Sequence, residues 1–275
     1  MEIRQTTSNR ALEVVAHRGV AERAPENTLP AFLQALAVGA DAIELDVRLT
    51  RDRVPVVHHY YYLDEVIALS GPIYDYTLDQ LRAARLRISG DSTEPASADG
   101  WRIPTLTDVL DTVGGQIGLE IEIKGPEPEA PGIVAEVLAK YRQLWDGIEV
   151  TSYEPMLLRD IQQRCPGLAT DLLMPRSPDW MREDVLAYEA IHRGQLAGAR
   201  AVHLQARQLS SAVISSIRSH GLDIHAWDVN DEQALGHMLD LSIKRVCTDN
   251  ARQMVNAVRR MLSPTGGRQS PCDAG

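Results

Sequence analysis

The chain has 275 residues and a formal net charge of −10, with 44% hydrophobic and 24% charged residues. These proportions are ordinary for a soluble globular enzyme, and the acidic balance argues against nucleic acid or an anionic membrane as a partner. An anionic substrate would therefore need a few local cations. The length exceeds that of a usual single domain, but α/β barrels reach about 250 residues as one domain.

The cysteines and the apolar runs indicate the compartment. Cys165, Cys247 and Cys272 are far apart and show no CxxC spacing, which argues against a disulfide scaffold or a structural zinc site. The N-terminus has no long apolar segment behind a basic start, and no run of about 18 apolar residues occurs. We therefore expect a cytoplasmic protein without an integral membrane segment.

The first strand, turn and helix come before residue 40. Leu12–Ala16 is a short apolar run typical of a buried strand, and His17 and Arg18 follow at its end. Pro-Glu-Asn-Thr at residues 25–28 then leads into an apolar segment with helical spacing, which Gly39 ends. The order is strand, turn, helix.

The next strand carries two acidic residues on one face. In residues 42–49, apolar side chains alternate with polar ones, so Glu44 and Asp46 point to the same side. A charged face of this kind is natural on an exposed strand. Inside a barrel, however, it would bury two charges, which is costly unless a cation compensates them.

A third apolar run ends at His58 and His59 and follows the second strand too closely for a parallel crossover. A hairpin return is the better interpretation. If the link at residues 50–53 forms a two-residue turn, counting along both strands predicts that Glu44 lies opposite His59, although a bulge would shift this register by one.

Residues 60–103 break the pattern with three tyrosines, a short helical piece and a polar stretch, so we interpret them as an insertion over the site. Beyond it, alternating strand and helix patterns continue to the C-terminal region. The expected strands are 116–124, 148–152, 169–174, 201–204, 224–229 and 244–248; the expected helices are 105–113, 132–141, 155–163, 177–199, 210–220, 231–239 and 251–262.

About eight strands with intervening helices predict an α/β fold, a closed (β/α)8 TIM barrel. A doubly wound open sheet is the alternative, but the chain has no GxGxxG or phosphate-loop lysine motif. We expect a single domain at 11–262, with the insertion at about 60–103 and flexible termini at 1–10 and 263–275. Reactive groups of a barrel lie at the C-terminal strand ends, where His17, His59, Glu122, Ser152 and Trp227 fall.

Several motifs together resemble those of the glycerophosphodiester phosphodiesterase family. They are His-Arg-Gly at 17–19, Pro-Glu-Asn-Thr at 25–28, Gly-Ala-Asp-Ala-Ile-Glu-Leu-Asp-Val at 39–47, Val-Val-His-His at 56–59, Glu-Ile-Lys at 122–124, Trp-Asp-Val-Asn at 227–230 and Thr-Asp at 248–249. The combination spans about residues 14 to 250. His-Arg-Gly alone is weak, because it recurs at 192–194 in a helical context to which we assign no role.

The resemblance implies a TIM barrel that hydrolyses a small-molecule glycerophosphodiester to glycerol 3-phosphate and an alcohol, in glycerol and lipid metabolism, with one divalent metal, Mg²⁺ or Ca²⁺. It also implies the roles of individual residues. His17 and His59 match the acid/base histidines; Glu44, Asp46 and Glu122 match the metal carboxylates; Arg18 and Lys124 match the phosphate-binding cations; and Trp227 is expected to line the substrate cavity, with Glu120 as a supporting or ion-paired carboxylate.

The same residues suit this chemistry on physical grounds. The oxygens of an anionic phosphodiester must be neutralised, which a metal, Arg18 and Lys124 can do. Carboxylates without thiolates favour a hard cation. Two imidazoles can move the protons of the attacking and leaving oxygens near neutral pH. The attacking group is either water or a neighbouring hydroxyl of the substrate, and the sequence does not choose between them.

The chain also departs from the family pattern after its second histidine. Tyr60 stands where the family usually has Asp, and Glu65 stands where Arg is expected. These departures motivate two alternatives, a lysophospholipase D-like or other alkyl phosphodiesterase and a catalytically weakened phosphate-ester binding protein. The sequence predicts no oligomeric state.

Overall fold

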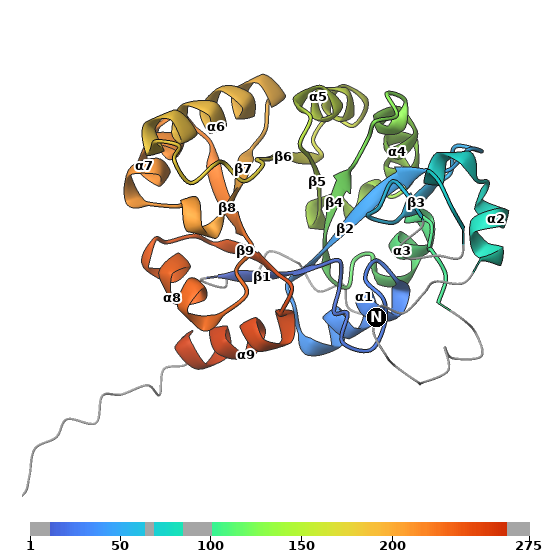
Figure 1. The fold of residues 1–275 in the computed structure, drawn as a ribbon, viewed down its shortest axis with the longest axis horizontal. Coiled ribbons are helices and arrows are strands. Elements are labelled where there is room, and N and C mark those ends of the chain that lie inside the picture. Colours follow the sequence, from blue (N-terminus) through green and yellow to red (C-terminus); the bar gives the residue numbers. More distant parts are fainter. Residues whose placement is uncertain (1–11, 64–68, 85–100, 263–275) are drawn as a thin grey trace, which may run out of the picture.

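A computed structural model describes residues 12–63, 69–84 and 101–262, and in it eight parallel strands close into a barrel (Figure 1). The predicted TIM barrel is confirmed. Its strands are β1 (Glu13–His17), β2 (Ala42–Leu49), β4 (Gly118–Ile123), β5 (Ile148–Ser152), β6 (Ala169–Leu173), β7 (Ala201–Gln205), β8 (Asp223–Trp227) and β9 (Arg245–Thr248).

The barrel closes where the first strand lies between the second and the last. Val15 pairs with Cys247 on β9 and with Ala42 on β2, both in parallel register. Residues more than 200 positions apart therefore meet at one strand end. This closure brings the end of β9 beside the end of β1.

Helices cover the outside of the barrel (Figure 1). They are α1 (Leu29–Val38), α3 (Leu106–Val113), α4 (Ala130–Ala139), α5 (Pro155–Arg164), α6 (Glu183–Ala197), α7 (Ser211–Ser219), α8 (Glu232–Asp240) and α9 (Ala251–Leu262), with short 3-10 turns at Arg142–Gly147 (η2) and Ala206–Gln208 (η3). The helix predicted at 177–199 is too long, because the chain enters α6 only at Glu183. The preceding segment is instead a loop at the mouth of the barrel.

The ninth strand, β3 (Pro55–Val57), pairs antiparallel with the end of β2, so the predicted hairpin is confirmed. Its predicted register is wrong by one residue. Thr50 pairs with Val54 rather than Arg53, and Arg53 adopts a left-handed φ of 61°, as in a three-residue hairpin loop with a bulge. The carbonyl of Asp46 consequently accepts the N–H of His58, at 2.9 Å.

The insertion after His58 and His59 contains η1 (Ile73–Asp75) and α2 (Leu78–Ala83), which Thr77 caps. It has a small apolar core of its own, formed by Val56, Leu63, Ile73, Leu81 and Ile103. The predicted polar tail of the insertion and the two predicted flexible termini lie outside the described residues.

The main apolar core lies between the sheet and its helices, where Phe32, Leu45, Leu119 and Ile121 are fully buried. Inside the barrel, the apolar side chains of Val15, Ala42 and Cys247 form only a small separate cluster. Most other inward positions of the strands are polar or charged, whereas branched apolar residues usually fill a barrel. In the described part of the chain, no helix is long and apolar enough to cross a membrane.

Candidate active site

Three buried carboxylates converge at the C-terminal ends of β2 and β4. Glu44, Asp46 and Glu122 place carboxylate oxygens within 4.8 Å of one another. The pairing of the two strands explains this, because Asp46 lies directly across from Glu122 in the parallel register and Glu44 is two residues earlier on the same face. The sequence-predicted metal carboxylates are thus brought together.

Two cations lie against these carboxylates. Arg18 places its Nε 3.2 Å from Asp46, and Lys124 places its Nζ 3.0 Å from Asp46 and 2.7 Å from Glu122. We call these five residues, Arg18, Glu44, Asp46, Glu122 and Lys124, the upper cluster. Asn27 of the Pro-Glu-Asn-Thr segment also holds Asp46, because its Nδ2 donates a hydrogen bond to Oδ2 of Asp46 at 2.7 Å.

The loop after β1 fixes the positions of His17 and Arg18. Arg18 adopts a left-handed φ of 55°, and its backbone N–H donates to Glu44 at 3.1 Å. Gly19 follows with a φ of 86°, and a Cβ there would lie about 2.9 Å from the backbone of Ala31 on α1. A side chain at Gly19 would therefore push the loop away from the helix and move His17 and Arg18.

The electrostatics of the upper cluster indicate a missing positive charge. Burial, together with the charges of Asp46 and Glu122, raises the pKa of Glu44 well above its usual value. Burial likewise raises the pKa of Glu122 to about 7, although Lys124 opposes it. Burial also disfavours the charge of Asp46, but Lys124 and Arg18 outweigh it and hold the pKa of Asp46 well below its usual value.

This arrangement fits a divalent cation. The donor set consists of oxygens alone, as Mg²⁺ and Ca²⁺ prefer. A cation between the carboxylates would relieve the mutual repulsion that raises the pKa of Glu44. The Oδ1 atom of Asp46 is buried and accepts no hydrogen bond within the described residues, which leaves it available as a ligand beside its ion pair with Lys124.

His17 lies between the carboxylates and the end of β9. Its Nε2 is 3.8 Å from Glu44, and its Nδ1 is 2.6 Å from Oδ1 of Asp249. A carboxylate on Nδ1 fixes the ring orientation and favours the tautomer with a proton on Nδ1. The second ring nitrogen of His17 is therefore directed toward the site.

Asn230 holds Asp249 in place. Its Nδ2 donates to Asp249 and to Asp228, each at 2.9 Å, and its Oδ1 accepts the N–H of Asp249 at 2.8 Å. The amide thus separates two carboxylates that would otherwise repel each other. Asp228 is also anchored by Gln205 of β7, whose Nε2 donates to it at 2.8 Å.

His59 follows β3 on the other side of the site and is half-buried. Burial lowers its pKa to about 3, although the nearby charge of Asp46 opposes this, so the imidazole is neutral near pH 7. Arg48 fixes the backbone, because its Nε donates to the carbonyl of His59 at 2.8 Å, and the ring of Tyr60 packs edge-on against the imidazole. Glu65 lies outside the described residues.

Trp227 ends β8 and packs on the small apolar cluster of Val15, Ala42 and Cys247. Its indole Nε1 is buried and has no hydrogen-bond partner within the described part of the chain. It lies at the same end of the barrel as the carboxylates, with an N–H that is unpaired within the described residues.

Comparison with known proteins identifies the family. Residues 17–253 match the model of the glycerophosphoryl diester phosphodiesterase family. The chain belongs to this family. The resemblance seen in the sequence motifs is thereby confirmed, and the protein is an enzyme, a phosphodiesterase of this family.

Relatives of the phosphodiesterase span most of its length. The YhdW protein of Bacillus subtilis (strain 168), provisionally named a glycerophosphodiester phosphodiesterase, is 33% identical over 239 residues, covering 86% of this chain and 93% of the relative. A glycerophosphodiester phosphodiesterase of Caldanaerobacter subterraneus is 27% identical, covering 90% and 98%. Among solved structures, an Oleispira antarctica phosphodiesterase in complex with the product sn-glycerol-3-phosphate has a TM-score of 0.75 at 23% identity, covering 90% and 96%.

The barrel of this phosphodiesterase holds a second charged group below the first. His203 on β7 lies with Nδ1 3.2 Å from Glu120 and Nε2 3.5 Å from Asp171. Arg200 and Arg245 each place a guanidinium nitrogen 2.5 Å from Glu149. We call Glu120, Glu149, Asp171, His203, Arg200 and Arg245 the lower cluster. The expectation that Glu120 is ion-paired is confirmed.

The lower cluster also has the composition of a metal site. Glu149, Asp171, His203 and His225 place ligand atoms within 4.8 Å of one another. Arg200, however, already binds Asp171 at 2.7 Å as well as Glu149. With His203 protonated, three cations pair directly with three carboxylates in this group, although burial still raises the pKa of Glu149 to about 8.

The roles of Asp249, Asn230 and the lower cluster were not predicted from the sequence. Asp249 was noted only as part of a Thr-Asp motif, although its position at the end of the last strand is a usable signal. The lower cluster had a clearer signal. Buried parallel strands are normally continuous apolar runs, and polar residues such as Glu149, Asp171 and His203 interrupt them.

Proposed function

We propose that this phosphodiesterase hydrolyses glycerophosphodiesters to glycerol 3-phosphate and an alcohol, with Mg²⁺ or Ca²⁺ bound by Glu44, Asp46 and Glu122. The observation that carries the proposal is the convergence of three buried carboxylates with an oriented histidine, His17, in a chain of this family. The product named for the Oleispira antarctica structure supports the same reaction.

The metal would supply charge neutralisation for the phosphate oxygens and a fixed orientation of the substrate. Arg18 and Lys124 add to this neutralisation. Burial lowers the pKa of Lys124, but Asp46 and Glu122 outweigh it and raise the value, so the amine stays charged. Arg18 can present its planar guanidinium to two phosphate oxygens at once.

The two histidines divide the proton transfers in this proposal. His17 is the general acid in this proposal, because the carboxylate of Asp249 holds Nδ1 and leaves Nε2 facing the site. His59 is the general base in this proposal, because its imidazole is neutral and lies on the other side of the site from His17. The attacking hydroxyl, from water or from the substrate itself, loses its proton to His59, and the leaving alkoxide gains one from His17.

Trp227 completes the proposed substrate cavity. Its buried indole N–H lacks a partner in the described residues, and an unsatisfied buried donor is costly unless a ligand pairs with it. A glycerol hydroxyl is a suitable acceptor. The cytoplasmic location expected from the sequence stays a prediction.

The proposal is tested by assaying release of glycerol 3-phosphate from a panel of glycerophosphodiesters. Enzyme treated with EDTA should lose activity, and addition of Mg²⁺ or Ca²⁺ should restore it. Full activity after chelation would contradict the metal assignment, whereas release of the alcohol phosphate instead of glycerol 3-phosphate would contradict the proposed product.

A lysophospholipase D-like activity is the second candidate. Tyr62, Met156 and Trp180 are 61%, 70% and 81% exposed, and all three lie on segments that follow C-terminal strand ends. Exposed apolar side chains around the mouth of the barrel would favour an amphiphilic substrate. Comparing turnover of lysophosphatidylcholine with that of glycerophosphocholine separates the two. The complete set of site residues gives no support to a binding protein without turnover.

A further inference from the structure

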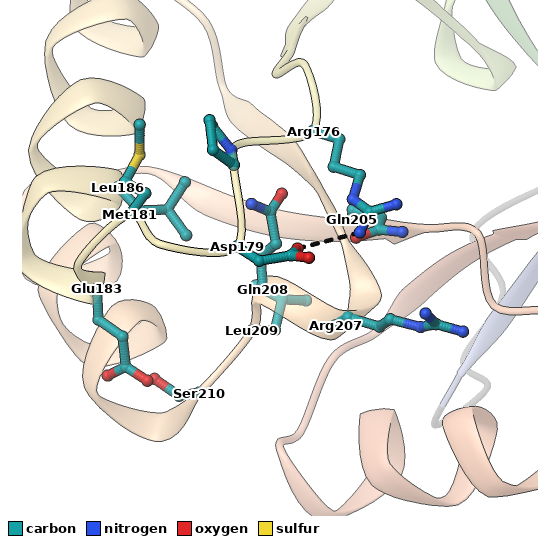
Figure 2. Close-up of a pocket in the computed structure, with 11 residues that line it drawn as sticks. Arg176, Asp179, Met181, Glu183, Leu186, Gln205, Arg207, Gln208, Leu209 and Ser210 are labelled. Carbon is teal, nitrogen blue, oxygen red and sulfur yellow. Dashed lines mark hydrogen bonds and ion pairs between the residues drawn. The ribbon is translucent and has the colours of Figure 1, made fainter.

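A pocket opens at the active-site end of the barrel, between the segment after β6 and the segment after β7 (Figure 2). It has a volume of about 430 Å³. Arg176 and Asp179 line it from the first segment, and Gln205 and Arg207 from the second. Because both segments follow C-terminal strand ends, the pocket faces the same side as the catalytic groups.

The wall of this pocket is continuous with the site. Gln205 lines the pocket and donates to Asp228, which accepts from Asn230, which in turn holds Asp249 against His17. If His17 protonates the leaving oxygen, the alcohol lies on the His17 side of the phosphate. That side adjoins β8 and β9, whereas the carboxylates on β2 and β4 lie on the other side.

The lining offers many hydrogen bonds and little net charge. Arg207 is exposed and its guanidinium has no partner among the described residues, while Arg176 is paired with Asp179 at 3.0 Å. Figure 2 shows the two guanidinium groups on one side of the pocket and the apolar Met181 and Leu186 on the opposite side. Guanidinium and amide groups donate, and carboxylate and amide oxygens accept, which matches hydroxyl groups that do both.

The lining does not suit a quaternary ammonium group. Such cations are recognised by aromatic cages, and none of the residues that line the pocket is aromatic. Two carboxylates also line the pocket, Asp179, which is paired with Arg176, and Glu183, while Arg207 is an unpaired cation within the described residues. A choline headgroup would therefore find no aromatic face here and would meet the like charge of the Arg207 guanidinium.

We propose that this pocket binds the leaving alcohol and selects a hydroxyl-rich one, such as glycerol or inositol, with Arg207 as the main donor. The inference rests on the proposed function, since it takes the alcohol to leave from the His17 side. It names the substrate class of that same reaction. Arg207 is a specificity-determining residue and takes no part in the proton transfers.

The experiment compares two substrates that share the glycerophosphate half, glycerophosphoinositol and glycerophosphoethanol. Replacing one donor to a polar ligand typically costs about tenfold in binding. Arg207→Ala should therefore lower kcat/KM for glycerophosphoinositol about tenfold through KM, and leave glycerophosphoethanol unchanged. Gln208→Trp, which fills the pocket, should give the same pattern.

Arg182→Ala is the matched control, because Arg182 lies on the same rim but bonds Asp184 outside the pocket. It should leave both substrates unchanged. Equal losses on both substrates, or no loss in Arg207→Ala, would overturn the inference while hydrolysis itself continues. If wild-type enzyme hydrolyses neither substrate in the presence of metal, the proposed function fails instead.

Discussion

Two groups of buried charges lie in the same barrel, yet only one of them looks prepared for a ligand. In the upper cluster, three carboxylates face two cations, and the pKa of Glu44 is raised well above its usual value. In the lower cluster, Arg200, Arg245 and protonated His203 pair directly with three carboxylates, although burial still raises the pKa of Glu149 to about 8. The comparison teaches that clustered carboxylates and histidines do not by themselves define a metal site, because arginine side chains can already take the place of the cation.

Position in the barrel separates the two groups further. Glu120 and Glu122 lie two residues apart on β4 and point to the same side, but only Glu122 reaches the open C-terminal end. Glu120 is 2% exposed and meets His203 deeper inside. We therefore expect changes in the upper cluster to affect turnover and changes in the lower cluster to affect stability.

The largest effect is expected at the catalytic histidine. His17→Ala should lower kcat by about 10²- to 10⁴-fold, the range for a positioned acid or base, with an unchanged melting temperature. The chain offers a matched control in its second His-Arg-Gly, where His192 lies on α6 and stacks on Tyr188. His192→Ala should keep full activity. Near wild-type turnover of His17→Ala on the best substrate would remove the acid assignment.

A change in the lower cluster should act on folding instead. Arg245 is largely buried and pairs with Glu149 and Glu13, so Arg245→Met removes one of the two arginines that compensate the buried Glu149. We expect a loss of about 3–5 kcal/mol in the free energy of unfolding, measured in urea. Arg252→Met, which breaks the exposed pair with Glu22, should cost less than about 1 kcal/mol. Similar small losses in both variants would mean that the lower cluster contributes little to stability.

Asp249 provides a smaller effect on the catalytic side. Asp249→Asn keeps the shape but replaces the carboxylate that orients the His17 ring through Nδ1, so kcat should fall about 10- to 100-fold with little change in KM. Formate should partly restore Asp249→Ala, because the Asp249 side chain is 59% exposed and its place is accessible. Asp223→Asn, at the opposite end of β8, is the control. Unaltered kcat in Asp249→Asn would show that His17 needs no such partner.

The smallest expected effect is a pH dependence of the free energy of unfolding that arises from the lower cluster. Burial lowers the pKa of His203, but Glu120 and Asp171 outweigh it and raise the value to about 10. Because this pKa lies above the unfolded value near 6.5, the stabilisation is complete below pH 6.5 and is lost as pH rises through 10. Burial raises the pKa of Glu149 to about 8. Its contribution to the free energy of unfolding is therefore also lost as pH rises, but this loss is complete at a lower pH than that of His203.

Urea unfolding between pH 8 and 10 measures the contribution of His203. We expect the free energy of unfolding to fall by about 1–2 kcal/mol across this range in the wild type. His203→Gln should flatten the slope. A wild-type stability that does not change over these two pH units would mean that His203 is neutral in the folded protein.

The sequence predicted the fold and the upper cluster well for a physical reason. In a barrel, reactive residues must lie at C-terminal strand ends, and His17, Glu44 and Glu122 sit where apolar runs end or alternate. The predicted hairpin register was wrong because Arg53 adopts a left-handed conformation that lengthens the loop by one residue. Such a conformation is not expected from the sequence at a residue other than glycine. The contact of Asp249 with His17 was missed because 232 positions separate them and only barrel closure joins them.

The central claim is that the upper cluster, and not the lower one, binds a divalent cation. Calorimetric titration of the EDTA-treated enzyme with Ca²⁺ and Mg²⁺ tests it directly, in the wild type and in two matched Glu→Gln variants. We predict that Glu44→Gln abolishes binding and that Glu149→Gln retains it. Loss of binding in Glu149→Gln with normal binding in Glu44→Gln would contradict the account.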